Sequence, residues 1–252
     1  MAEKIEDIAL EYHAAALPDM FIEEECQKFE LDWILSNFPE KKVKVLDLGF
    51  GDGINFKAIA PLCDLTMVEG SELLCSKALQ YVTEHRLGAK VVHSMFEDFQ
   101  TTERFDVILA THVLEHVDDP IALLEFLRSL LRTDGKLVGI VPNSESYHRR
   151  LGLIMGLQTS LDELSPRDHL VGHQRVYSLS RLKKDIQESG FELLAHRGFF
   201  LKVLANSQMT HLGVDVLRGL LKLSDELTTE MCANIGFVLT VNKDLVLKSD
   251  HS

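Results

Sequence analysis

The sequence predicts an α/β fold, in which a doubly wound and mostly parallel sheet carries helices on both faces. Three observations lead to this prediction. A short apolar run over 43–48 enters a loop with glycines at alternate positions, followed by a helical pattern. Further apolar runs over 64–69, 89–93 and 105–111 alternate with helical segments, as parallel strands joined by crossover helices do. At 252 residues, the chain can bury one substantial core.

The first run reads V-K-V-L-D-L-G-F-G-D-G from Val43 to Gly53 and predicts a buried strand that ends in a glycine loop. Without a Cβ atom, the backbone can turn sharply and approach a ligand closely. The helix predicted over 54–60 then presents free N–H groups, which favour a carboxylate or a phosphate. The second run ends at Glu69, whose carboxylate can accept hydrogen bonds from two vicinal hydroxyls.

These runs carry a resemblance to a known family. The pattern D-x-G-x-G-x-G at 47–53 resembles motif I of class I S-adenosylmethionine (AdoMet)-dependent methyltransferases. The run F-D-V-I-L-A-T-H-V-L-E-H-V-D-D-P over 105–120 resembles the fourth strand and following loop of small-molecule methyltransferases of the ubiquinone-biosynthesis type. The resemblance covers about residues 40–145. It implies a Rossmann-like, seven-stranded sheet in the order 3-2-1-4-5-7-6, with N-terminal helices and a helical insertion after strand five.

The resemblance also implies AdoMet as the cofactor and assigns residues to it. Asp47 is expected near the methionine amino group, and Glu69 on the ribose hydroxyls. The glycine loop would lie against the methionine moiety, through Gly49, Gly51 and Gly53. Met95 and Phe96 stand where the family often has an Asp-Ala pair for adenine, and they would sandwich the ring. Thr111 and His112 would face the cofactor's sulfur.

The remaining elements complete a single domain over 1–252. Residues 1–40 are expected to form a helical lid that brings Tyr12 near the substrate, the alternative being a helix that only packs on the core. Residues 41–141 would form the cofactor half, with a helix from Asp119-Pro120 to about Asp134-Gly135 and a strand over 136–141. Residues 142–178 would form the substrate-side insertion. Residues 179–252 would complete the sheet, with strand segments from 191 and over 201–207, a helix over 211–227 and a strand over 234–242.

Methyl transfer to a hydroxyl requires alignment of donor and acceptor and removal of a proton, a task that histidine suits near neutral pH. His112, Glu115 and His116 would share one face of a helical turn. Their spacing resembles the residues at which some ubiquinone-type enzymes hold a divalent metal. The first position is commonly acidic there and is His112 here, so we expect no metal. Glu115 would mainly orient the loop.

A second polar group lies in the insertion. We expect a substrate pocket there, formed by His148, His169, Arg175 and Tyr177, with Arg149, Arg150 or Arg175 available to an acidic substrate. His173 belongs to the same stretch. The catalytic candidates are therefore His116, His173 and His112, while a structural role for any one of these side chains is an alternative.

Composition limits the partners. A net charge of −13 argues against nucleic acid. No apolar run reaches the roughly 18 residues of a membrane span, no signal peptide is evident, and four scattered cysteines fit a reducing, cytoplasmic setting. We expect an enzyme that methylates a hydroxyl of a saccharide, phenol or secondary metabolite. The alternatives are a small-molecule N-methyltransferase, a non-catalytic AdoMet-binding subunit, or an NAD-linked oxidoreductase, against which Ile54 argues. A homodimer is left open.

Overall fold

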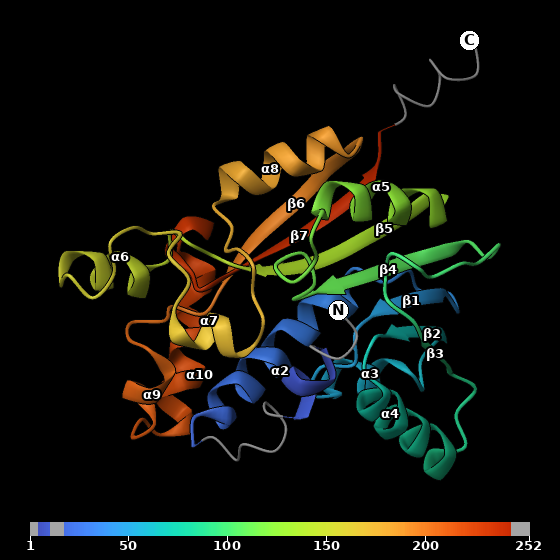
Figure 1. Cartoon of the computed structure of the whole chain (residues 1–252), viewed down its shortest axis with the longest axis horizontal. Coiled ribbons are helices and arrows are strands. Elements are labelled where there is room, and N and C mark those ends of the chain that lie inside the picture. Colours follow the sequence, from blue (N-terminus) through green and yellow to red (C-terminus); the bar gives the residue numbers. More distant parts are fainter. Residues whose placement is uncertain (1–4, 11–17, 243–252) are drawn as a thin grey trace.

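The computed structural model describes residues 5–10 and 18–242, and its core is one seven-stranded sheet in the order β3-β2-β1-β4-β5-β7-β6 (Figure 1). All neighbouring strands from β3 to β5 are parallel, while β7 is antiparallel to both β5 and β6. This confirms the predicted sheet. The strands are β1 (Lys44–Leu48), β2 (Asp64–Glu69), β3 (Lys90–His93), β4 (Phe105–Thr111), β5 (Leu131–Pro142), β6 (Phe191–Phe199) and β7 (Asn234–Val241).

Helices cover both faces of the sheet because alternate strand residues point to opposite sides. Leu46 and Leu48 of β1 belong to one core cluster, with α5 (Pro120–Leu130) and α8 (Leu179–Glu188). Val45 belongs to the cluster on the other face, which the remaining sheet-covering helices complete. Those helices are α2 (Met20–Ser36), α3 (Ile54–Ile59) and α4 (Glu72–His85). In Figure 1 the two sets lie above and below the strands.

The junction between α5 and β5 differs from the prediction. The Asp119 side chain accepts a hydrogen bond from the Ala122 N–H (3.0 Å) and Pro120 opens the helix, as expected. The helix ends at Leu130, however, and β5 begins at once with Leu131, which pairs with Phe105. The helix expected as far as Asp134-Gly135 is therefore too long, because the pairing with β4 takes over the chain four residues earlier.

The segment after β6 also differs. Residues 201–207, expected to extend the sheet, lie outside it, and α9 (Asn206–Met209) begins within them. The helix expected over 211–227 is shorter, α10 (Val214–Leu223), and a 3₁₀ turn over Ser224–Glu226 follows it. Leu217 and Leu221 of α10 pack with Ile22 and Cys26 of α2 in a third apolar cluster. The segment thus covers α2 instead of widening the sheet.

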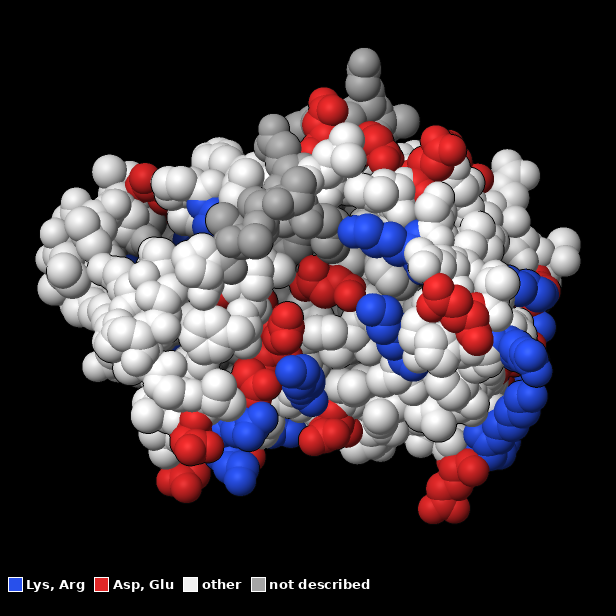
Figure 2. All heavy atoms as spheres, turned by 90° about the horizontal axis from the view of Figure 1, so that it is seen from below, with Lys and Arg blue, Asp and Glu red and all other residues white. Residues whose placement is uncertain are grey.

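The insertion after β5 holds two short helices, α6 (Tyr147–Ile154) and α7 (Pro166–Leu170). The far end of α6 is apolar and exposed at Leu153, Ile154, Met155 and Leu157. In Figure 2 few charged side chains appear at the left end of the molecule, where α6 lies in Figure 1. Among the described residues, none of the helices is long and apolar enough to cross a bilayer.

Candidate functional site

The glycine loop lies at the carboxyl end of β1, where open α/β sheets bind ligands. All three glycines have left-handed backbone conformations, with φ of +86° at Gly49, +52° at Gly51 and +77° at Gly53. A Cβ atom at Gly53 would lie 2.5 Å from the Phe50 ring, so a larger residue does not fit there. Gly53 caps the start of α3, and this end of the helix faces the ligand edge of the sheet.

Glu69 ends β2 and lies beside this loop. Its Oε2 atom accepts a hydrogen bond from the Phe50 N–H (2.8 Å), and its Oε1 atom accepts one from the Ser71 N–H (2.8 Å). Burial raises the pKa of Glu69, and the backbone hydrogen bonds offset only part of that rise. The carboxylate thus joins the ends of β1 and β2, and its remaining lone pairs suit hydroxyl donors.

Asp47 lies on β1 with 2% of its surface exposed. Burial, and next the charge of Glu69, raise the pKa of Asp47 to about 7. Two buried carboxyl groups so close together favour a cationic ligand, which would stabilise both charges. An ammonium group at this position would meet that requirement.

The other expected cofactor residues surround the same edge. A Cβ atom at Gly49 would lie 4.0 Å from Phe96 Cζ, and one at Gly70 would lie 3.1 Å from Met95 Sδ. The Asn55 amide donates to Thr111 Oγ1 (3.4 Å). Met95 and Phe96 therefore lie beside the chain ends that the cofactor would contact.

The N-terminal helical residues 5–10 also reach this edge. The Glu6 carboxylate accepts hydrogen bonds from the N–H groups of Glu72 (3.0 Å) and Leu73 (3.1 Å), and so caps α4. Ile8 lies against Gly172 of the insertion. Tyr12, expected near the substrate, lies outside the described residues.

His112 follows β4 in a left-handed conformation (φ +55°) and lies between two carboxylates. Its Nδ1 atom is 3.2 Å from Glu115 Oε1, and its Nε2 atom is 3.8 Å from Glu30 Oε2. Burial lowers the pKa of His112, but both carboxylates together raise it to about 10. His112 is therefore an imidazolium at neutral pH and has no lone pair to accept a proton. Its two carboxylate partners argue against the role of base that was expected for His112.

Glu30, on α2, was not singled out by the sequence. It is 2% exposed and accepts a hydrogen bond from Asn234 Nδ2 (2.7 Å). One signal was available, because Ile22, Cys26, Glu30 and Ile34 follow the four-residue spacing of a buried helical stripe. A carboxylate on such a buried stripe indicates a polar partner on the elements that pack against the helix.

Glu115, His116 and His173 form a compact group in which one ligand atom of each lies within 4.8 Å of the others. Glu115 is fully buried, and its Oε2 atom has no hydrogen-bond partner among the residues the structure describes. Its Oε1 atom is 4.0 Å from His173 Nε2. Burial lowers the pKa of His116 to about 4, so this side chain is neutral at pH 7.

His173 is oriented by Asp168 of α7. The distance from His173 Nδ1 to Asp168 Oδ1 is 2.8 Å, and Asp168 Oδ2 is 2.6 Å from Arg149 Nη2. Asp168 also accepts hydrogen bonds from the N–H (2.8 Å) and hydroxyl (2.6 Å) of Ser165. With Nδ1–H held by the carboxylate, Nε2 of His173 is the basic atom and faces Glu115. Asp168 was not singled out by the sequence, although it lies five residues before His173.

Three residues expected in a substrate pocket have other positions. The Arg175 guanidinium donates to the carbonyl oxygens of Leu114 (2.8 Å), Val117 and Asp118 (3.1 Å), so it holds the loop after β4. Tyr177 is completely buried in the core, where its ring packs among apolar side chains. His169 is exposed on α7. The structure therefore places Arg175 and Tyr177 in structural positions and His169 at the surface, which argues against the substrate pocket expected for them.

His148 is half-buried near the start of α6. Its Nδ1 atom is 3.1 Å from Ser146 Oγ. Burial, together with the charges of Lys202 and Arg149, lowers the pKa of His148 to about 2, so it is neutral across the physiological range. The substrate-facing role expected for His148 stays a prediction.

The donor set of Glu115, His116 and His173 is of a kind that binds zinc or a similar ion. Asp168 even supplies the outer carboxylate that such a histidine ligand usually has. The position of His112 argues against a metal ion at this site. The His112 imidazolium already pairs with Glu115 Oε1 and would repel a cation beside that oxygen. The carboxylate that the family commonly has at this position would attract the ion instead.

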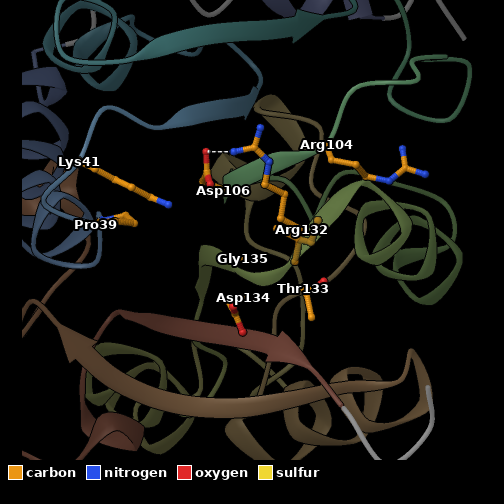
Figure 3. Close-up of a pocket in the computed structure, with 9 residues that line it drawn as sticks. Pro39, Lys41, Arg104, Asp106, Arg132, Thr133, Asp134 and Gly135 are labelled. Atoms are coloured by element: carbon orange, nitrogen blue, oxygen red, sulfur yellow. Dashed lines mark hydrogen bonds and ion pairs between the residues drawn. The ribbon is translucent and has the colours of Figure 1, made fainter. Parts of the chain in front are cut away.

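A hollow of about 590 Å³ lies at the opposite, amino-terminal edge of the strands (Figure 3). Two of its charged lining residues form an ion pair, with Arg132 Nη1 2.7 Å from Asp106 Oδ2. It is remote from the glycine loop and from the histidine group, which lie beyond the carboxyl ends. The chemistry therefore concentrates at the other edge.

The chain was compared with known proteins. The model of a family described as a methyltransferase domain matches residues 21–196, which include the glycine loop, Glu69, the His112 loop and the insertion. A ubiquinone biosynthesis O-methyltransferase of Glaesserella parasuis is 33% identical over 173 residues, 65% of this chain and 71% of the relative. One of Actinobacillus pleuropneumoniae is 35% identical over 101 residues, 37% of this chain and 43% of the relative. The chain thus spans less than half the length of that relative.

Solved structures share the fold at low identity. A methyltransferase of Thermotoga maritima, described as a possible histamine N-methyltransferase, aligns with a TM-score of 0.61 and 19% identity over 95% of this chain and 99% of its own. The plantazolicin methyltransferase BamL aligns with a TM-score of 0.56 and 16% identity over 96% and 91%. On the family match, which covers most of the residues, the chain belongs to the methyltransferase-domain family.

Proposed function

We propose that the protein is an AdoMet-dependent methyltransferase that methylates a hydroxyl group of a small molecule. The family membership, the glycine loop and the two buried acids Asp47 and Glu69 support the cofactor. The relatives named ubiquinone biosynthesis O-methyltransferase support oxygen as the acceptor atom. The observation that carries the proposal is the 2.8 Å contact of His173 Nδ1 with Asp168 Oδ1, which leaves a basic Nε2 atom at the ligand edge.

The cofactor half would bind AdoMet through two carboxylates and through close approach of the glycine-loop backbone. Asp47 would hold the ammonium group, and Glu69 would accept from the ribose hydroxyls. Gly49, Gly51 and Gly53 leave room for the methionine moiety against the chain. When bound, AdoMet supplies a methyl group already activated by its sulfonium.

The histidine group would remove the acceptor's proton. His173 Nε2 accepts the hydroxyl proton as the new carbon–oxygen bond forms, and Asp168 stabilises the resulting imidazolium. Glu115, 4.0 Å from that nitrogen, adds a second negative charge. His116 packs edge-on against His173, with ring centroids 4.8 Å apart, and limits how the ring can turn.

Calorimetric titration with S-adenosylhomocysteine, with NAD as the control ligand, tests the cofactor. We expect micromolar or tighter binding of the first and none of the second. Binding of NAD alone, or of neither compound, would withdraw the proposal. Turnover on matched hydroxyl and amine acceptors then separates O-methylation from N-methylation, and a protein that binds cofactor but methylates no acceptor would be a non-catalytic subunit.

Asp168→Asn tests the catalytic arrangement. The amide keeps the shape but cannot stabilise an imidazolium, so we expect kcat to fall on the order of 10²-fold while S-adenosylhomocysteine affinity stays near the wild-type value. Asp162→Asn is the control, because Asp162 lies in the same insertion but is exposed. An unchanged kcat in Asp168→Asn would remove His173 from the role of base.

A further inference from the structure

His112 lies where the cofactor half meets the histidine group. It directly follows Thr111, whose hydroxyl receives a hydrogen bond from Asn55 of α3 (3.4 Å), beside the glycine loop. On its other side, His112 Nδ1 and His173 Nε2 lie 3.2 Å and 4.0 Å from the same oxygen atom, Glu115 Oε1. The His112 ring is thus situated between the glycine-loop edge and the histidine proposed as base.

The backbone holds His112 in a conformation that histidine rarely adopts. Its φ of +55° is in the left-handed region, and its N–H donates to the Ile140 carbonyl of β5 (2.8 Å). Such a conformation costs free energy in a residue other than glycine, and it persists mainly at functional sites, where the surrounding structure enforces it. Asparagine tolerates the same region, so it can replace the charged ring with little change of the backbone.

Two carboxylates maintain a positive charge on the His112 ring. Glu115 Oε1 lies 3.2 Å from Nδ1 and Glu30 Oε2 lies 3.8 Å from Nε2, and both acids are buried. Burial lowers the pKa of His112, but the two acids raise it to about 10. The ring is therefore a fixed cation at neutral pH, held by one acid from α2 and one from the loop after β4.

The Nε2–H group of this cation remains available to a ligand. Its 3.8 Å distance from Glu30 Oε2 is longer than a hydrogen bond, and it has no other hydrogen-bond partner within residues 5–10 and 18–242. A ligand atom can reach the ring, because 35% of the His112 side chain is exposed. A charged donor of this kind binds an oxygen more strongly as that oxygen gains negative charge.

We propose that the His112 imidazolium is a catalytic residue that binds the acceptor oxygen through Nε2–H and stabilises the negative charge that this oxygen gains. The inference rests on the proposed function, because it concerns the hydroxyl that His173 deprotonates. The hydroxyl proton passes to His173 Nε2, and a lone pair of the oxygen forms the new carbon–oxygen bond. The carbon–sulfur bond breaks with its electron pair left on sulfur, and His112 keeps its proton throughout.

The test uses 4-nitrocatechol as the probe, because its visible spectrum shows whether its acidic hydroxyl is ionised. The pKa of the probe bound to the S-adenosylhomocysteine complex is measured by spectral titration in the wild type, His112→Asn and His112→Lys. We expect this pKa to be about 1–2 higher in His112→Asn than in the wild type, the size of a charge-assisted hydrogen bond. His112→Lys returns the positive charge and should restore part of the difference.

His211→Asn is the matched control, because it makes the same substitution at an exposed histidine before α10 and should keep the wild-type value. Melting temperatures and S-adenosylhomocysteine affinities verify that the variants keep the fold and the cofactor half. A direct contact should also shift the NMR resonance of His112 Nε2 when the probe binds to isotopically labelled wild-type protein.

Equal probe pKa values in the wild type and His112→Asn, an unshifted His112 resonance, or a probe that does not bind would each overturn the assignment. His112 would then serve only to connect α2 with the loop after β4. Failure of S-adenosylhomocysteine to bind would refute the proposed function separately. The same titration is then made on the free protein, where a higher probe pKa in His112→Asn supports the oxygen contact alone and equal values overturn it.

Discussion

Asp47 is a buried carboxyl group whose protonation should govern cofactor affinity. In the free protein its pKa is about 7, because burial and the charge of Glu69 disfavour the anion. An ammonium ligand requires the anion, so binding must release a proton below pH 7. The affinity should therefore be full above pH 7 and should fall as the pH drops below it.

We predict that the association constant for S-adenosylhomocysteine falls by up to about tenfold per pH unit below pH 7, measured by calorimetry from pH 8 to pH 5.5. Asp47→Asn should bind more weakly at pH 8 and should show a flatter profile. Asp64→Asn, at the opposite end of β2, serves as the control and should keep the wild-type profile. A pH-independent wild-type affinity would contradict this assignment of Asp47.

At the scale of elements, α2 is connected to the β4 loop through Glu30 and His112. The helix contributes the carboxylate and the loop contributes the imidazolium, with Asn234 of β7 on the other carboxylate oxygen. Because the pKa of His112 is raised above its unfolded value of about 6.5, its contribution to stability is complete below that pH. It is lost as the pH rises through about 10.

Glu30→Gln should therefore lower the free energy of unfolding by about 1–3 kcal/mol at pH 6, and by less at pH 10. Urea denaturation at both pH values measures the difference. Glu24→Gln, on the exposed face of the same helix, should have little effect at either pH. An equal loss at pH 6 and pH 10 would show that His112 is not the partner that matters.

Elements and residues differ in how far they could be predicted. The sheet order follows from the resemblance to the family, whereas the glycine loop and the capped α5 follow from local patterns of glycine and capping residues. The structure confirms all three. The end of α5 was misplaced because β5 pairs with β4, a contact between distant residues. Local propensity does not reveal where such pairing begins.

The site was harder to predict, because a polar side chain does not reveal what it binds. Arg175 and Tyr177 lie in a polar stretch of the sequence. Arg175 nevertheless donates to three backbone carbonyls, and Tyr177 is buried in the core. Glu30 lies 82 positions before His112, and only the fold brings them together. His173 was singled out, but its orientation depends on Asp168 and Arg149 from two different helices.

At the scale of the whole molecule, the group formed by Glu115, His116 and His173 allows two kinds of chemistry, proton transfer and metal binding. The fold places the His112 imidazolium against Glu115, which supplies the carboxylate among Glu115, His116 and His173. A metal ion bound to Glu115 would be repelled by the positive charge of His112, because His112 Nδ1 lies 3.2 Å from Glu115 Oε1. Proton transfer without a metal is therefore the expected mode.

We predict that methyl transfer survives treatment with EDTA followed by dialysis into metal-free buffer. Activity before and after treatment, and after addition of Zn²⁺ or Mg²⁺, is the measurement. Activity that disappears with the chelator and returns with one of these ions would instead assign Glu115, His116 and His173 as metal ligands. His112→Glu, which restores the acid that the family commonly has, is the comparison variant and should gain metal affinity.

The position of Glu69 has a consequence for how the cofactor would arrive. Its two oxygen atoms are already held by the N–H groups of Phe50 and Ser71, so the carboxylate has one orientation before any ligand is present. The Glu69 side chain therefore loses its conformational freedom when the protein folds, and binding of the cofactor need not restrict it further. Entry of the ribose would resemble docking onto a rigid template, with little rearrangement of the loop and an association rate governed by encounter.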